Sequence, residues 1–263
     1  MTAPLPASGA PTSADAAALG AVRRRPRPRL VKVIRMHLAN RATYVYIPLI
    51  VVGATFALSI ALYGVLLLGL EEDAPRELYG LGGFQFVPFY YAVTVGIQAM
   101  MYTYPFAMAM SLTRREYING SVALAALFAG GLAGLYALGR FAEEATGGFG
   151  IGFHYFGLVG WFSWFAWWEQ WLFLTGLTLM LFMAGFCATT VFKRGGALRL
   201  VAEITAWTMS FVGVIALVTW QEWWPAVGEW FLALTPATAG GWILVVAGVL
   251  SLGAYWSIRK AVP

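Results

Sequence analysis

Six long apolar segments, separated by short polar gaps, dominate the pattern of hydrophobic and polar positions along the chain. Each segment has roughly the 20 apolar residues that a helix needs to cross a hydrocarbon core about 30 Å thick. The segments span residues 46–70, 86–110, 120–139, 171–192, 200–220 and 240–258. This pattern predicts an all-α, polytopic membrane protein with six transmembrane helices.

Positive charge is distributed unevenly over the gaps between the segments. All but two of the 17 Lys and Arg residues precede the first segment, follow the last one, or lie in the second and fourth gaps. The two exceptions are Arg76 and Arg140. Because cytoplasmic loops carry the excess of Lys and Arg, both termini are expected in the cytoplasm. We therefore expect a multi-pass protein of the cell membrane.

Composition narrows the class further. The chain is 60% hydrophobic and only 11% charged, which is far from the composition of soluble domains. Its formal net charge of +5 belongs to one predicted membrane face, where anionic lipid headgroups are the natural partner. Membrane lipids are therefore expected partners, and nucleic acid is not.

The chain carries few residues suited to catalysis or to metal binding. His37 and His154 are its two histidines, and the predicted topology places them on opposite sides of the membrane. Cys187 is its one cysteine, and no G-x-x-x-x-G-K-[ST] phosphate loop occurs. We expect no catalytic site, no metal and no cofactor on this chain. Glu203, the acid nearest to a segment interior, is expected to pair with Arg199 one turn earlier.

The N-terminal region divides into two parts. Residues 1–28 are rich in Ala, Pro, Ser and Thr and have no periodicity, which predicts a disordered cytoplasmic tail before a membrane domain of residues 29–263. Residues 29–40 are basic and amphipathic, which predicts a helix lying in the cytoplasmic interface. Its cations are Arg29, Lys32 and Arg35. A basic flank with no special role is the alternative.

Two rows of residues recur at helical spacing inside the segments. Thr94, Gln98 and Tyr102 share one face of the second segment, so they either form hydrogen bonds between helices or line a transport pathway. The third segment carries a row of small residues that favours close approach of two helices. This row is Ala126, Gly130 and Gly134. The third gap is rich in tryptophan, and residues 156–168 are expected to lie along the outer membrane surface.

The most distinctive motif follows the second segment and reads SLTRREYINGS over residues 111–121. Thr113 and Glu116 form the S/T-x-x-E signature of a capping box, which predicts that a helix starts here. Arg114 and Arg115 are then expected to be exposed in the first turn of that helix, just outside the membrane. Cations at this end oppose the helix dipole, so a partner or lipid headgroups would explain them.

Taken together, these features resemble the membrane subunit of an ABC exporter of the six-helix ABC-2-type permease family. The resemblance rests on the amphipathic segment 29–40, on SLTRREYINGS after the second span, and on WWPAVGEWFLAL before the sixth. That last stretch resembles a short helix that dips back into the membrane. The long aromatic third gap departs from the pattern of the family.

The resemblance implies a transport subunit that is coupled to a separate ATPase. ATP would be bound by that ABC ATPase subunit, and a second permease copy or a related permease would complete the substrate pathway. A coupling helix on the ATPase would be formed by Thr113, Arg114, Arg115, Glu116 and Tyr117. The alternative is an accessory or immunity-type membrane protein without a transport function.

The predicted topology can be checked by cysteine labelling in intact cells. Cysteines at Ala74 and Gly148 should react with a membrane-impermeant thiol reagent, whereas one at Gly196 should not, because the gaps alternate between the two sides. Labelling of position 196 with protection of the other two would contradict the topology.

Overall fold

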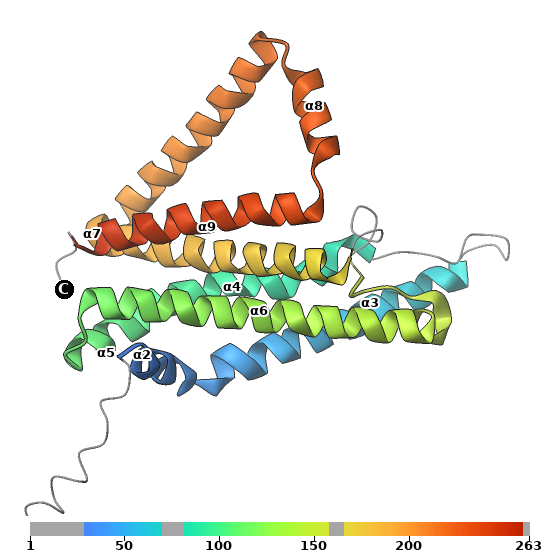
Figure 1. Ribbon diagram of the computed structural model, residues 1–263, viewed down its shortest axis with the longest axis horizontal. Coiled ribbons are helices and arrows are strands. Elements are labelled where there is room, and N and C mark those ends of the chain that lie inside the picture. The colour runs from blue at the N-terminus through green and yellow to red at the C-terminus, as the bar shows by residue number, and fades with distance from the viewer. Residues whose placement is uncertain (1–28, 70–80, 158–165, 260–263) are drawn as a thin grey trace, which may run out of the picture.

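The computed structural model describes residues 29–69, 81–157 and 166–259, and these residues form helices joined by short turns (Figure 1). The predicted tail, residues 1–28, lies outside the described residues. The major helices are α2 (Arg29–Leu38), α3 (Ile47–Gly69), α4 (Val87–Gln98), α5 (Tyr104–Ala109), α6 (Arg114–Thr146), α7 (Trp167–Trp220), α8 (Trp224–Ala233) and α9 (Pro236–Arg259). π-helical turns precede α3 and link α4 to α5, and a 3-10 turn precedes α4. These turns are η1 (Ala42–Tyr46), η3 (Ala99–Thr103) and η2 (Leu81–Phe86).

Within the described residues, four helices are long and apolar enough to cross a membrane, which supports the predicted all-α membrane class. They are Ala42–Leu68, Arg114–Thr146, Trp167–Trp220 and Pro236–Trp256. The helical path from α4 through η3 to α5 is interrupted by the π-turn and is not among the four.

Helix α7 has 54 residues but is not one straight rod. Gly196 has φ 69 and ψ −168, a conformation outside the helical region that glycine adopts readily. The first arm, residues 167–195, lies in the bundle, and the second arm, residues 197–220, leaves it (Figure 1). The predicted pair of Arg199 and Glu203 is confirmed at 3.4 Å. Both side chains are exposed, so the pair contributes little stability.

The bundle is built around the first arm of α7, against which α4, α6 and α9 pack. Glycines permit the closest contacts. A Cβ atom on Gly96 of α4 would overlap the carbonyl of Phe182, and one on Gly185 of α7 would overlap the carbonyl of Val93. These two backbones therefore touch without side chains between them.

The row of small residues on α6 does not bring two helix backbones together within this chain. The side chain of Trp171 lies over Gly130 and Gly134, while Ala126 is exposed. Within the described residues the space above Gly130 and Gly134 is taken by an indole ring of α7, and close packing of this row at a seam between subunits stays a prediction.

Helix α2 packs on the start of α6 instead of lying free. Val33 is fully buried, and its side chain occupies the space above Gly120 where a Cβ atom would otherwise sit. Arg35 is exposed, as an interfacial cation would be. The side chains of Arg29 and Lys32 lie outside the described part of the chain. Part of the apolar face predicted to meet lipid is thus used for contact with protein.

The structure also refines the sites for topology labelling. Gly148 is buried, and a side chain there would meet the backbone of Phe153. Gly196 has a positive φ that disfavours cysteine. Ala145 and Ala197 are exposed helical neighbours and provide better labelling positions on the same two gaps.

The contact between α4 and α7 yields a stability prediction. Gly96→Ala should lower the thermal midpoint of the detergent-solubilised protein, because overpacking costs about 1–3 kcal/mol. Gly64→Ala on α3 is the matched control, since nothing lies within 4 Å of its Cβ position. Alanine there should keep or raise the midpoint, because it favours the helix by about 1 kcal/mol. Equal midpoints for the two variants would contradict the close contact.

Candidate functional site: an apolar groove along α6

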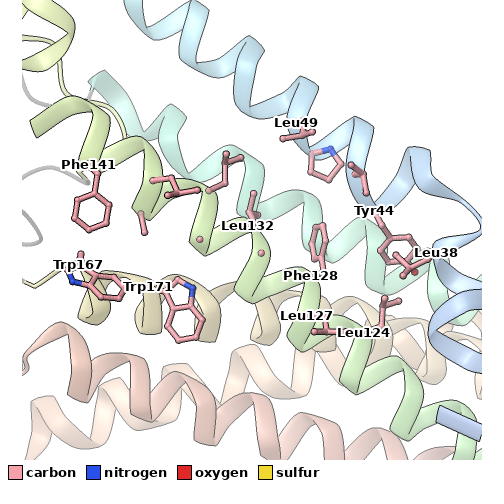
Figure 2. A pocket seen from close by; sticks show the side chains of 17 residues that line it. Leu38, Tyr44, Leu49, Leu124, Leu127, Phe128, Leu132, Phe141, Trp167 and Trp171 are labelled. Carbon is pink, nitrogen blue, oxygen red and sulfur yellow. The ribbon is translucent and has the colours of Figure 1, made fainter. Parts of the chain in front are cut away.

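An apolar groove of about 760 Å³ runs between the start of α3, the outer face of α6 and the start of α7 (Figure 2). Its α6 wall extends from Leu124 to Phe141, which is about 26 Å at 1.5 Å per residue. Tyr44 and Leu49 contribute from η1 and α3, and Trp171 contributes from α7. The groove therefore has the length of an extended acyl chain and walls made almost entirely of carbon.

Two of the polar side-chain groups at the walls are already bonded to the protein. The indole N–H of Trp171 donates to the carbonyl of Gly130 at 3.1 Å. The Tyr44 hydroxyl is 2.9 Å from Nδ1 of His37. Among the residues that the structure describes, no charged side chain lines the groove. A ligand would thus be held by its apolar surface and shape, with little recognition by hydrogen bonds.

A buried polar cluster closes one end of the groove and joins α2 to α6. Nε2 of His37 lies 3.3 Å from the Ser121 hydroxyl, while its Nδ1 meets Tyr44. The ring of Tyr117 lies beside the imidazole, with centroids 5.7 Å apart. His37 and Ser121 are both buried, and Tyr44 occupies the place that the carboxylate has in a catalytic triad. This cluster therefore positions helices and is not suited to nucleophilic catalysis.

Burial also sets the protonation of His37. Desolvation lowers the pKa of this imidazole to about 4, because the charged form loses its hydration inside the α2–α6 contact. At neutral pH the ring is uncharged, so one of its nitrogens can accept a hydrogen bond while the other donates.

The capping motif is confirmed in structure, but its surroundings differ from the prediction. Thr113 accepts from the backbone N–H of Glu116, whose carboxylate in turn accepts from the N–H of Thr113. The helix that starts here is α6 itself, not a separate short helix. Arg115 is exposed as predicted, while Arg114 is half-buried.

Tyr117, which the resemblance assigns to the coupling helix on the ATPase, is not exposed as a residue that contacts a partner would be. Its side chain is fully buried, and its hydroxyl donates to the carbonyl of Ala99 in η3. The Ala99 carbonyl also accepts the backbone N–H of Tyr104 across the π-turn, so the hydroxyl of Tyr117 is a second donor to it. Tyr117 therefore joins α6 to η3 and is not available to a cleft on another protein.

The predicted pathway row is separated by the same π-turn. Gln98 is half-buried and accepts a hydrogen bond from the Thr43 hydroxyl, as the interhelical alternative expects. Thr94 and Tyr102 are exposed on the outside of the chain. Thr94 and Gln98 lie on α4 before the π-turn and Tyr102 lies within it, and the pathway alternative for these three side chains stays a prediction.

Most groove residues were missed from the sequence. They recur along one face of α6 at helical spacing and include Leu124, Leu127, Gly131, Leu135 and Leu138. In a transmembrane helix, however, apolar residues occur on every face, so this face carries no distinguishing signal. No group of three or more metal-binding side chains exists within the described residues.

The chain was compared with protein-family models, with curated proteins and with solved structures, and none of these matches it.

The His37 cluster predicts a dependence of stability on pH. The pKa of His37 is below its ordinary value when α2 is docked, so undocking takes up a proton. Stability is therefore full above pH 6.5 and falls as the pH drops towards 4. The loss at pH 5 should be roughly 2 kcal/mol.

Thermal midpoints measured at pH 7.5 and pH 5 would test this dependence. His37→Asn removes the titrating group while keeping a polar side chain, and it should flatten the difference. An equal acid-induced drop in the wild type and in the variant would contradict the role of His37.

Proposed function

We propose that this chain is the membrane-spanning permease subunit of an ATP-driven ABC exporter, acting on an amphipathic substrate. The proposal counts six spans: α3, the path from α4 to α5, α6, the two arms of α7, and α9. It places the protein in the cell membrane with both termini in the cytoplasm. ATP would act only through a partner ATPase.

The observation that carries the proposal is that two features lie on the same helix, α6. One helix bears the exposed Arg115 in its capped first turn, and the wall of the apolar groove along its length. Its 33 residues are about 50 Å long, and an α-helix of this kind moves as a rigid body over short displacements. A partner that pulls on Arg114 and Arg115 would thereby change the groove.

The buried polar cluster around His37 extends this coupling to α2. Val33 and His37 attach α2 to α6 near Gly120 and Ser121, and Leu38 forms part of the groove. A displacement at the capped turn would therefore be transmitted to an interfacial helix and to one end of the groove. This arrangement suits an exporter in which an ATPase acts from the cytoplasm.

The second arm of α7 and helix α8 support pairing with another permease. Nearly every side chain of residues 200–220 is exposed, including Trp207 and Phe211. Helix α8 is a short, aromatic helix between this arm and α9, as expected for a segment that dips back into the membrane (Figure 1). A second permease copy or a related permease would cover the arm that the chain's own bundle leaves open.

Two variants, Arg115→Glu and Gly131→Leu, test the contact with the ATPase and the role of the groove separately, and Ala145→Glu is a control. Arg115→Glu should abolish co-purification of an ABC ATPase with the solubilised complex, because interface arginines can each contribute more than about 2 kcal/mol. Ala145→Glu introduces the same charge at the exposed opposite end of α6 and should leave co-purification unchanged. Gly131→Leu should retain the ATPase but lower its stimulation by amphipathic lipids, because the added side chain enters the groove, where nothing lies within 4 Å of its Cβ position.

The outcomes distinguish the exporter from its alternative. If no ATPase accompanies the wild-type protein, an accessory or immunity-type membrane protein becomes the better interpretation. If an ATPase accompanies both the wild type and Arg115→Glu, with full stimulation, the coupling role of the capped turn is wrong.

A further inference from the structure

The end of the bundle opposite α2 is closed by a folded-back segment, residues 147–157, that follows α6. Phe153 and Tyr155 are buried almost completely among residues of α3, α4 and α6. Phe56 of α3 contacts four of the segment's rings, those of Phe149, Phe153, Tyr155 and Phe156. The segment therefore fills the bundle end with side chains of its own.

A single carboxylate holds the far end of this segment. Glu143, near the end of α6, is buried and accepts hydrogen bonds from the backbone N–H groups of Tyr155, Phe156 and Gly157. Hydrogen bonds to a charged acceptor are roughly twice as strong as those between neutral groups. Three backbone donors on one side chain make Glu143 the main polar attachment of the segment.

A second chain of polar contacts braces the same place from α7. The side chain of Gln170 donates to the carbonyl of Phe156 at 2.6 Å. Arg140 in turn donates to the Gln170 side-chain oxygen at 2.9 Å and pairs with Glu144 at 2.7 Å. The segment is thus fastened to α6 and α7 at one short stretch of backbone.

The beginning of the segment has the backbone of a hinge. Five of its first six residues have positive φ, and four of these are glycines, for which this region carries no steric penalty. The five are Gly147, Gly148, Phe149, Gly150 and Gly152. The segment is a glycine-rich turn followed by an aromatic end that is held by hydrogen bonds. Such a segment can leave the bundle and return to it as a unit.

Beneath the segment, α3 presents a buried row of polar side chains. Thr55, Ser59 and Tyr63 are spaced four residues apart on one helical face. The Thr55 hydroxyl lies 2.6 Å from that of Tyr155, and Tyr63 donates to the carbonyl of Ile151 at 2.9 Å. The hydroxyl of Ser59, between them, is buried without a hydrogen-bond partner in the described part of the chain.

We propose that residues 147–157 form a plug latched by Glu143, and that release of the plug opens the polar row of α3 to water. The segment supplies partners to Thr55 and Tyr63 when seated, and water would replace those partners when it leaves. Glu143 is a positioning residue in this device. The proposal does not rest on the exporter function, because it concerns how one end of the bundle is closed, whether or not the protein transports a substrate.

Hydrogen exchange of the full chain in lipid nanodiscs tests the latch. The amides of residues 155–157 should be protected in the wild type. Glu143→Gln replaces one acceptor oxygen with an NH₂ donor, so their exchange should accelerate at least about tenfold. Glu203→Gln is the matched control, since its exposed side chain pairs with Arg199 on the second arm of α7 and does not touch the plug or the residues that fasten it. Unprotected wild-type amides, or equal exchange in the two variants, would overturn the latch.

A steric variant releases the plug without touching the carboxylate. A Cβ atom on Gly139 of α6 would overlap the ring of Phe156, whereas one on Gly131 of the same helix meets nothing within 4 Å. Gly139→Ala should therefore accelerate exchange at residues 155–157, and Gly131→Ala should not. Both substitutions raise helix propensity equally, so a difference in hydrogen exchange between the two variants is caused by the contact with the plug. Protected amides in Gly139→Ala would also overturn the proposal.

Thiol labelling then tests whether release opens the row. Ser59→Cys is a small change at the buried position, made in a Cys187→Ser background. Cys at position 59 should react slowly with a water-soluble reagent, and about tenfold faster when Gly139→Ala or Glu143→Gln is added. Amides in the contact between α7 and α9 should keep their protection throughout, which separates plug release from unfolding. Fast labelling with the plug seated, or no change after its amides are freed, would show that the segment is not a gate.

Discussion

A hydrocarbon core is about 30 Å thick, and a helix of 33 residues is about 50 Å long, so α6 must extend beyond the core. Much of the structure depends on this constraint. The charged residues of α6 are gathered near its ends, with Arg115 and Glu116 in the first turn and Arg140, Glu143 and Glu144 in the last turns. Between them the helix is apolar and provides both a packing face for α7 and the wall of the groove.

The ends of α6 also organise the elements around it. At the first end, Tyr117 and Ser121 hold η3 and His37, so the attachment of α2 depends on where α6 starts. At the other end, Glu143 holds the backbone that precedes α7. Both attachments use buried polar groups whose partners are satisfied, which is the condition for placing such groups in an apolar interior. A polar contact at either end thus specifies position as well as stability.

The candidate site illustrates how tertiary contacts change the meaning of a motif. The capping box at Thr113 and Glu116 is local, because its two hydrogen bonds involve residues three positions apart, and it was predictable from four letters of sequence. The burial of Tyr117 was not predictable in this way. The acceptor for its hydroxyl is a carbonyl of the π-turn η3, which lies outside α6. No local sequence pattern predicts that turn.

The sequence by itself determined the class of this protein, since hydropathy and length decide which segments form helices suited to a membrane. It also determined the capped start of α6 and the pair of Arg199 and Glu203, which depend on neighbours within one turn. Only the tertiary structure decided the groove, because apolar side chains on a membrane helix look alike whether they face lipid, protein or a cavity. It likewise decided the role of Glu143, whose three donors lie twelve or more residues away and were brought to it by the turn of a glycine-rich segment.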